Sequence, residues 1–525
     1  MFSLQFTTNA SIYARQALSC QSQFQQGGGS QLQLLYADHL LERLQGLQSG
    51  SLQQRLLACI QAAIIEGVFP RGGRLPPTRD IARELGVSRN TVLHVYDSLM
   101  AQGYVTARTG SGTWVAETLP EICLQSQAVE LLQPAATSLP ATLSKRGAML
   151  LGHATASPYQ WGAFVPGAPD VTEFPHKLFS QIQARLNRDP DVHRLIYSSG
   201  GGCPDLRHAL AEYLRVARSV KADADQILIT EGIHQAVDLV SCVLGDPGDL
   251  VWMEEPGYWG TRNVLRKNGL KIRAVPVDEE GIVPASGPPP RMVFVTPSHQ
   301  YPLGAHLSLA RRKALLALAR RHQSWIIEDD YDSEFRFSGK PWPSLQGLEE
   351  DAPVIYMGTF SKTLYPALRI GYMVVPKMLA DPLRTAAAEL YRGGHLLIQR
   401  ALGEFIRQGH YMDHIRRMRL LYGQRRQFLC RLIERYLGPS FLPQANHEAG
   451  LHLVLRLPAG CDDVAIAAQA LKRGVKVRAL SQYYMHQQSQ RGLLLGYACV
   501  NERQCQDAFG VLKGCLAEAG VTAAP

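Results

Sequence analysis

From about residue 161 to the end of the chain, helical patterns alternate with short apolar runs. The clearest runs cover residues 226–230, 250–254, 292–296, 325–328 and 354–358. Short buried strands separated by helices are typical of a mainly parallel sheet that carries helices on both faces. The pattern therefore predicts an α/β fold for residues 159–525, with room for a large central sheet and a smaller C-terminal subdomain.

Residues 50–118 follow a different order, which is three helices and then a hairpin. Helices are predicted from Leu52, over residues 78–85 and over residues 88–102, and two short strands flank a glycine turn at residues 110–112. Seven arginines against four acidic residues between Ser51 and Ala116 make the segment basic, which suits a phosphate-rich partner. We predict a winged helix-turn-helix that binds DNA, and the alternative is a winged helix used only for protein contacts.

The third helix of this segment holds side chains suited to DNA. Thr78 and Ser88 are the predicted N-caps of the second and third helices. The first turn after Ser88 exposes Arg89, Asn90 and Thr91, which are residue types that reach phosphates and base edges in the major groove.

Three segments, residues 72–82, 85–92 and 103–116, resemble the winged helix of the GntR family of repressors. The resemblance implies contact with a double-stranded DNA operator. The residues it implicates are Arg79, the helix residues Ser88, Arg89, Asn90 and Thr91, and the hairpin tip at Thr109 and Gly110.

Two further segments are predicted to lie outside the folded domains. Residues 1–35 hold no Asp or Glu and one basic residue, so we expect residues 1–49 to form a flexible, Gln-rich leader. Residues 119–158 are weakly periodic and interrupted by prolines, which indicates an interdomain linker. The ten cysteines are scattered without a C-x-x-C pair, and no apolar run suits a membrane span, so we expect a cytosolic protein that is associated with the bacterial nucleoid when bound to DNA.

The densest chemistry lies in residues 358–372. Lys362 stands between the hydroxyl residues Thr359 and Ser361 on one side and Arg369 on the other. A lysine amine can form a Schiff base with a phosphorylated aldehyde cofactor, while hydroxyls and a guanidinium hold the phosphate. The alternative is a solvated surface lysine, although Lys362 follows a strand of the buried type, where burial would lower its pKa.

An acidic pair ends the strand at residues 325–328. Asp329 and Asp330 follow it directly, and Tyr331 comes next. Ligands of α/β sheets bind at the carboxyl ends of the strands, where a carboxylate can pair with a protonated pyridinium nitrogen. A metal-binding or helix-capping pair is the alternative for the two acids.

With the turns at residues 229–235, 255–260 and 297–304, these segments resemble fold-type I enzymes that use pyridoxal 5'-phosphate (PLP), the aspartate aminotransferase superfamily. The resemblance covers about residues 160–515. It implies that Lys362 carries PLP as a Schiff base, that Asp329 pairs with the pyridinium and that Tyr258 stacks on the ring. It also implies PLP contacts from Thr359, Ser361, Arg369, Gly232, Ile233, Tyr331 and Tyr301, and from Tyr197 across a homodimer interface.

The chain departs from the superfamily pattern at three places. Tyr301 stands where an asparagine usually meets the ring hydroxyl, and Tyr331 comes one position early after the aspartate. Residues 494–497 lack the arginine that often binds a substrate carboxylate, so Arg478 is the substitute candidate, with a surface arginine as the alternative. These departures argue against efficient transamination rather than against PLP binding.

A winged helix joined to an aminotransferase-like domain resembles the MocR subfamily of GntR regulators over about residues 50–515. The resemblance implies a homodimeric DNA-binding regulator whose large domain binds PLP and senses PLP, an amino acid or an amine. Two rival hypotheses remain. One is an active aminotransferase with an attached DNA module, and the other is a repressor whose large domain has lost PLP and only dimerises.

Overall fold

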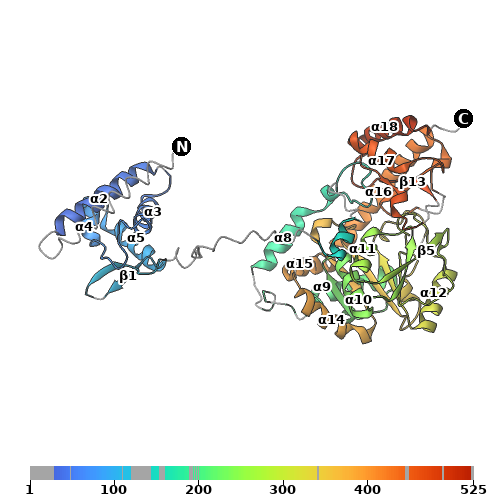
Figure 1. The fold of residues 1–525 in the computed structure, drawn as a ribbon, viewed down its shortest axis with the longest axis horizontal. Helices are drawn as coiled ribbons and strands as arrows, with labels where there is room; N and C mark the ends of the chain where they lie inside the picture. Colours follow the sequence, from blue (N-terminus) through green and yellow to red (C-terminus); the bar gives the residue numbers. More distant parts are fainter. Residues whose placement is uncertain are drawn as a thin grey trace. The chain divides into compact units, whose positions relative to one another are not determined.

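The structure is a computed structural model that describes residues 29–47, 49–108, 110–119, 143–152, 160–188, 193, 195–196, 198, 200–339, 342–443, 448–486 and 490–521. Two compact units make up the chain, Met1–Ala141 and Thr142–Pro525 (Figure 1). No helix within the described ranges is long and apolar enough to cross a membrane.

The first unit is built from helices and a two-stranded hairpin. Its elements are α2 (Gly29–Gly46), α3 (Leu52–Ile65), α4 (Thr78–Glu84), α5 (Arg89–Ala101), β1 (Val105–Arg108) and β2 (Gly112–Val115). α3 begins at a capping box, in which Ser51 and Gln54 each accept a hydrogen bond from the other's backbone. The hairpin is antiparallel, with Val105 opposite Val115. The order of α3, α4, α5 and the hairpin confirms the predicted winged helix.

The predicted leader needs correction where the structure has the helix α2. Tyr36 and Leu40 of this helix are buried in the core of the winged helix, and the ring centroids of Tyr36 and Phe69 lie 4.7 Å apart. Arg43 pairs with Glu66 of the neighbouring segment. The low charge and the glutamines of residues 1–35 favoured the prediction of a flexible leader over that of a packed helix. Residues 1–28 lie outside the described part of the chain.

An eight-stranded sheet forms the centre of the second unit. Its spatial order is β3-β10-β9-β8-β7-β4-β5-β6. β9, β8, β7, β4 and β5 run parallel, while β10 is antiparallel to both of its neighbours and β6 is antiparallel to β5. The strands are β3 (Ile227–Thr230), β4 (Leu250–Glu255), β5 (Lys271–Asp278), β6 (Gly281–Ile282), β7 (Met292–Val295), β8 (Trp325–Asp330), β9 (Val354–Thr359) and β10 (Gly371–Val374). This mostly parallel sheet confirms the α/β prediction.

Helices cover both faces of the sheet. Along β8, Ile326 packs into a core with α12 (Leu309–His322), and its neighbour Ile327 packs into a different core with α10 (Ile233–Leu244). This alternation follows from the strand geometry, in which successive side chains point to opposite faces. The other helices of this region are α8 (His176–Asn187), α9 (Pro204–Arg218), α11 (Trp259–Lys267), α13 (Leu345–Leu348), α14 (Lys377–Tyr391) and α15 (Leu396–Arg407).

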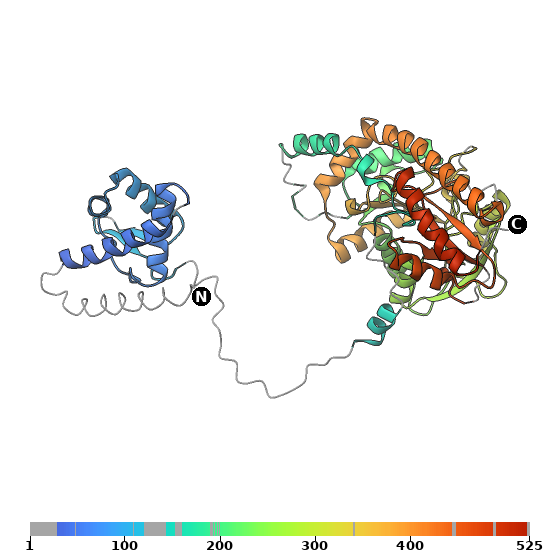
Figure 2. The ribbon, with the colours of Figure 1, turned by 90° about the horizontal axis from the view of Figure 1, so that it is seen from above.

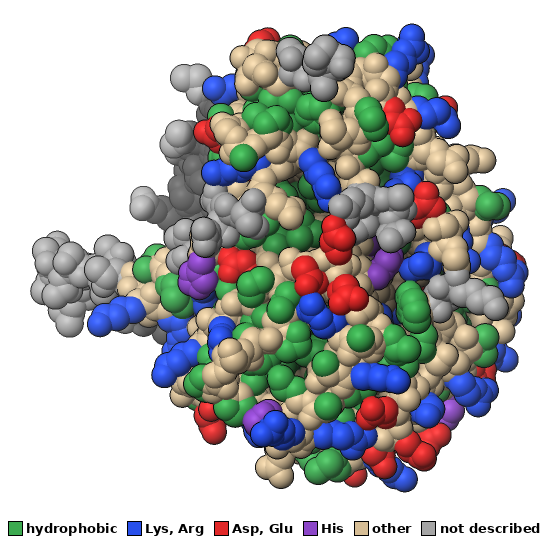
Figure 3. Space-filling model, turned by 90° about the vertical axis from the view of Figure 1, so that its right-hand side faces the viewer, with side chains coloured by type: hydrophobic (Ala, Val, Ile, Leu, Met, Phe, Trp, Pro, Cys, Tyr) green, Lys and Arg blue, Asp and Glu red, His purple; other side chains and the backbone are tan. Residues whose placement is uncertain are grey.

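A smaller antiparallel sheet follows the long helix α16 (His410–Tyr436). Its order is β11-β13-β12, formed by β11 (His452–Leu457), β12 (Arg478–Ala479) and β13 (Arg491–Gly496). α16, α17 (Asp463–Lys472) and α18 (Glu502–Glu518) lie side by side in orange and red in Figure 2. On the face drawn in Figure 3, basic and acidic side chains are interspersed, in contrast to the arginine excess of the winged helix.

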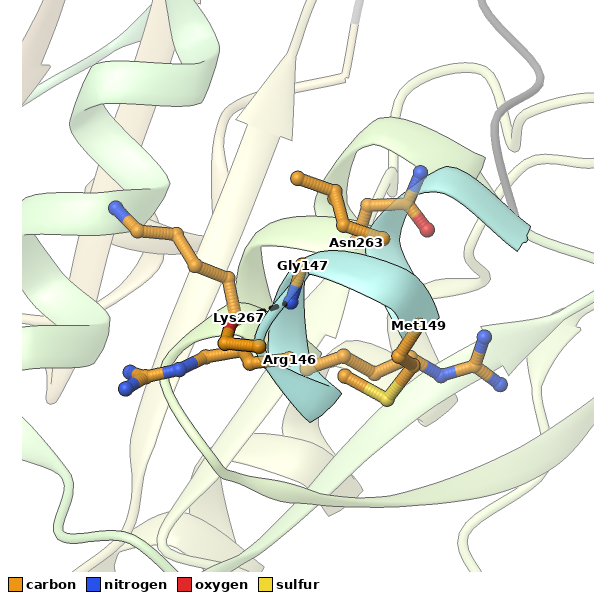
Figure 4. Close-up of a pocket in the computed structure, with 8 residues that line it drawn as sticks. Arg146, Gly147, Met149, Asn263 and Lys267 are labelled. Atoms are coloured by element: carbon orange, nitrogen blue, oxygen red, sulfur yellow. Dashed lines mark hydrogen bonds between the residues drawn. The ribbon is translucent and has the colours of Figure 1, made fainter. Parts of the chain in front are cut away.

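The predicted linker is also partly structured. Within residues 119–158, Leu119 is buried in the core of the winged helix, and α7 (Lys145–Gly152) belongs to the second unit. Figure 4 shows a pocket between α7 and α11 that is lined by Met149 from α7 and by Asn263 and Lys267 from α11. Residues 120–142 and 153–158 of the linker lie outside the described ranges.

Candidate functional site

Lys362 lies in the turn after β9, at the edge of the sheet where the parallel strands end. Its Nζ donates a hydrogen bond to the carbonyl oxygen of Gly167 at 2.9 Å. Burial lowers the pKa of the amine, and the nearby acids Asp332 and Asp329 oppose that shift. The side chain is therefore held inside the unit, in disagreement with the alternative of a solvated surface lysine.

The two acids at the end of β8 have different environments. Asp330 binds Arg218 through an Nε–Oδ2 distance of 2.7 Å, and the hydroxyl of Tyr356 also donates to that oxygen. The Oδ1 of Asp329 is shielded from solvent and has no hydrogen-bond partner among the described residues. Burial, with a smaller contribution from Asp330, raises the pKa of Asp329 to about 7. Asp330 thus pairs through its Oδ2, while its Oδ1, like the Oδ1 of Asp329, is a buried acceptor without a partner among the described residues.

Tyr331 belongs to a buried network that the sequence did not reveal. Its hydroxyl oxygen lies 2.9 Å from Nδ1 of His299, and Oδ2 of Asp332 lies 3.1 Å from the same nitrogen. Burial lowers the pKa of His299 to about 3 and raises that of Asp332 to about 8. At neutral pH the histidine is therefore uncharged, and the network fixes the position of Tyr331 without adding a net charge. Within the described ranges, no group of three or more His, Cys, Asp or Glu side chains has the arrangement of a metal site.

Aromatic rings surround Tyr301, which comes from the turn after β7. Its ring centroid lies 5.7 Å from those of Tyr258 and Tyr331 and 5.4 Å from that of Tyr483, all in edge contact. The hydroxyl oxygens of Tyr301 and Tyr483 are 3.1 Å apart. Tyr258 is the N-cap residue of α11, and its hydroxyl lies 3.0 Å from Nε2 of His234.

Arg478 on β12 reaches the same group of rings. Its guanidinium hydrogen-bonds the hydroxyl of Tyr483, and its charge adds to the lowering of the Lys362 pKa. The structure thus brings Arg478 close to Lys362 and Tyr301, in disagreement with the alternative of a plain surface arginine. Tyr483 was missed, because it follows β12 in a short helical turn and belongs to no segment that the sequence had marked.

A third group lies where β3, β9 and β10 meet. Gly371 of β10 is opposite Thr230 of β3 and opposite Thr359 of β9. Arg369 therefore comes close to the start of α10, where its guanidinium donates to the carbonyl oxygen of Glu231 at 2.6 Å.

The start of α10 carries donors that suit an anion. Gly232 is the N-cap residue with φ +88°, and Ile233 begins the helix. A Cβ at position 232 would lie 3.4 Å from the guanidinium of Arg369. The backbone N–H groups of a helix N-terminus, an arginine and the nearby hydroxyls of Thr359 and Ser361 are a donor set suited to a phosphate. Tyr197 lies outside the described residues.

In the first unit, α5 exposes Arg89 and Asn90. Ser88 is the N-cap residue as predicted, because its Oγ accepts from the backbone N–H of Thr91 at 3.1 Å. Thr78 is not a cap, since Pro77 holds the N-cap position in extended conformation and Thr78 is already helical.

The remaining predicted DNA contacts fall on α4 and on the hairpin. Arg79 on α4 and Gly110 at the hairpin tip are exposed, whereas Thr109 lies outside the described residues.

Comparison with protein families matches both units. The model "Bacterial regulatory proteins, gntR family" matches residues 52–115, and the model "Aminotransferase class I and II" matches residues 174–512. The solved structure of a multiple substrate aminotransferase from Thermococcus profundus covers 72% of this chain and 98% of its own, with 24% identity and a TM-score of 0.63. LysN, the alpha-aminoadipate aminotransferase of Thermus thermophilus, covers 72% of this chain and 99% of its own, with 26% identity and a TM-score of 0.63.

Relatives that span both units are regulators by name. The "Probable rhizopine catabolism regulatory protein MocR" of Rhizobium meliloti is 38% identical over 469 residues, which are 88% of this chain and 93% of the relative. The "HTH-type pyridoxine biosynthesis transcriptional regulator PdxR" of Corynebacterium glutamicum is 30% identical over 459 residues, which are 86% of this chain and 93% of the relative. The chain belongs to the MocR subfamily of GntR-type transcriptional regulators, in which a DNA-binding winged helix is joined to an aminotransferase-like domain.

Proposed function

We propose that the large domain of this regulator binds PLP and senses PLP itself or an amino compound, and that the bound state changes how a homodimer engages its operator. The observation that carries the proposal is the open Oδ1 of Asp329, a buried acceptor without a partner among the described residues, near Lys362. A buried acceptor costs free energy unless a ligand or water satisfies it. The protonated ring nitrogen of PLP is a donor of the required kind.

The residues present fit PLP at both of its ends. Asp329 would accept from the ring nitrogen, Tyr258 would lie against the ring and Lys362 would hold the aldehyde carbon. The phosphate would bind the start of α10 at Gly232 and Ile233, with Arg369, Thr359 and Ser361. Tyr331 and Tyr301 would lie near the ring hydroxyl, and the partner copy would contribute Tyr197. Bound PLP supplies an aldehyde that captures primary amines.

The surroundings of Arg478 indicate which amines would be sensed. The guanidinium of Arg478 and the hydroxyls of Tyr301 and Tyr483 form a donor set close to Lys362. Such a set recognises a carboxylate or another acidic group. We therefore infer an effector that carries a primary amine and an acidic group. The name of the Corynebacterium relative, a pyridoxine biosynthesis regulator, supports PLP itself as the other signal.

DNA contact is assigned to Arg79, Ser88, Arg89, Asn90, Thr91, Thr109 and Gly110. Two winged helices of a homodimer would bind two half-sites of the operator. A ligand shifts that arrangement to the extent that it binds one state of the dimer more tightly than the other.

The test combines visible absorption with DNA binding, using the full-length chain. PLP should give the absorption band of protein-bound cofactor in the wild type and no such band in Lys362→Ala. Lys313→Ala, which changes an exposed lysine on α12, is the control and should keep the band. Operator affinity should change with PLP or with an amino acid. Arg478→Ala should abolish the response to the amino acid and keep the response to PLP.

Two outcomes would contradict the proposal. Operator affinity that is the same with and without every ligand would refute sensing. Steady turnover of an amino donor and a keto acid, without any effect on DNA binding, would favour the active aminotransferase.

A further inference from the structure

Helix α5 has two distinct faces. Four of its residues are buried in the core of the first unit, Val92, Val95, Tyr96 and Leu99. The opposite face exposes Asn90, Leu93, His94 and Asp97. Leu93 is 47% exposed, which makes it the apolar member of an otherwise polar surface. Neither the sequence patterns nor the family resemblance had given this leucine a role.

Leu93 lies close to the residues of α5 that are proposed to contact DNA. Asn90 and Leu93 are three residues apart, so their side chains share one face and are neighbours on the helix. Recognition helices contact base edges with their N-terminal residues, and Leu93 is the fifth residue of α5.

The charges around Leu93 favour a nucleic acid over an apolar protein partner. Arg89, one turn before Leu93, is exposed. It stands at the N-terminal end of α5, where the helix dipole already favours anions. Arg79 on α4, which packs against α5, is also exposed, with 79% of its side chain accessible and its Nε 3.7 Å from the carboxylate of Asp80. Leu93 thus has Arg89 one turn before it and Asp97 one turn after it, so the end of this face that carries Arg89 and Asn90 is the end suited to a phosphate-lined major groove.

We propose that Leu93 is a base-reading residue that packs against the C5-methyl group of a thymine in the major groove. Thymine is the one DNA base that presents a methyl group there, and an asparagine pairs through its amide with adenine. Asn90 and Leu93 together then select an A·T-containing step in each half-site of the operator. This inference rests on the assignment of α5 as the recognition helix.

The experiment begins with duplexes selected from a random-sequence pool by the full-length protein. Each thymine of the preferred duplex is then replaced by uracil, which removes the methyl group and leaves every hydrogen bond of the base pair intact. For the wild type, uracil at one or two positions in each half-site should weaken binding about fourfold, since the burial of a methyl-sized group is lost. Leu93→Ala should bind the thymine duplex about fourfold more weakly and should no longer distinguish uracil at those positions.

Met100→Ala is the matched control, because Met100 is an exposed apolar residue at the other end of the same helix. It should keep the wild-type sensitivity to uracil at every position. Leu93→Met, which keeps an apolar side chain of similar size, should restore most of the discrimination.

Two results separate failure of this inference from failure of its basis. If Arg89→Ala and Asn90→Ala weaken binding but Leu93→Ala keeps the full uracil penalty, Leu93 does not read thymine. If Arg89→Ala and Asn90→Ala bind as tightly as the wild type, or if no duplex is selected, then α5 is not the recognition helix. The assignment of α5 and the assignment of Leu93 would then both be wrong.

Discussion

The substitution Asp329→Asn tests the buried acid of the candidate cofactor site through protein stability. It replaces the carboxyl group by an amide of nearly the same shape, so packing is preserved and the ionisable group is removed. Burial is the largest cause that raises the pKa of Asp329 from 3.8 to about 7, followed by the charges of Asp330 and Asp332. The cofactor-free wild type should therefore lose stability, relative to the variant, as the pH rises.

The sign follows from proton binding. Between pH 3.8 and about pH 7 the folded state holds a proton on Asp329 that the unfolded state has released. The free energy of unfolding therefore falls as pH rises through this window and becomes level above it. Each pKa unit is worth about 1.4 kcal/mol, so the full effect is about 4 kcal/mol. Of this, about 3 kcal/mol falls between about pH 5 and pH 8.

Urea unfolding of both proteins at these two pH values measures the difference. The other buried acids of the site, Asp332 and Glu254, are present in both proteins, so their contributions largely cancel. Asp381→Asn, which changes a carboxyl that is 87% exposed, should follow the wild type at both pH values. If the difference in the free energy of unfolding between wild type and Asp329→Asn is the same at both pH values, the reasoning is refuted. A buried acid with a raised pKa must change that difference between these two pH values. Saturating PLP should stabilise the wild type more than the variant, since the ring nitrogen would pair with the carboxylate.

Three other predictions concern stability and DNA binding. Leu40→Ala should destabilise the first unit by about 2–5 kcal/mol in urea unfolding, because Leu40 is fully buried between α2 and the winged helix. Arg218→Met should cost about 3–5 kcal/mol in the same assay, since it leaves Asp330 buried without its cation. Arg89→Ala should weaken operator binding and reduce the slope of affinity against salt by about one, without loss of the PLP absorption band.

The two substitutions of buried residues each have a counterpart on the surface. Leu47→Ala changes an exposed leucine just after α2 and should leave the unfolding curve near that of the wild type. Arg416→Met breaks an exposed ion pair with Asp413 and should have little effect. If a surface variant lost as much stability as its buried counterpart, burial would not explain the loss of stability. For Arg89→Ala, an equal loss of DNA binding and PLP binding would contradict separate sites for the two ligands.

The element order could be read from the sequence because local signals agreed with the fold. The run at residues 226–230 became β3 (Ile227–Thr230), and the run at 325–328 became the greater part of β8 (Trp325–Asp330). α2 could not be read in this way, since its leucines alternate with glutamines and charged residues, and its packing depends on side chains such as Tyr36 and Leu40 that are buried against the winged helix. Tertiary contacts stabilise that helix, whereas the local hydrophobic pattern is enough to predict the strands.

The residues of the candidate site can be separated in the same way, into those that local sequence reveals and those that tertiary contacts bring in. Lys362 and Asp329 stand out in sequence because each directly follows a strand of the buried type and carries reactive chemistry. His299, Asp332 and Tyr483 could not be predicted as site residues, because they reach the site through contacts with residues far away in the sequence. His299 and Asp332 meet across 33 positions, and Tyr301 and Tyr483 across 182. Sequence spacing has no bearing on such pairs.

The three segments of the proposed phosphate site show how the sheet joins what the sequence keeps apart. β10 is antiparallel to both β3 and β9, so the carboxyl ends of β3 and β9 and the amino end of β10 lie at the same edge. Gly371 is then opposite Thr230 and Thr359 together, and a Cβ on it would lie 2.9 Å from the Cα of Gly232. The loop that enters β10 can therefore carry Arg369 to the start of α10. A parallel β10 would place Arg369 at the opposite edge, so the reversal of this one strand is what allows the arginine and the helix N-terminus to meet.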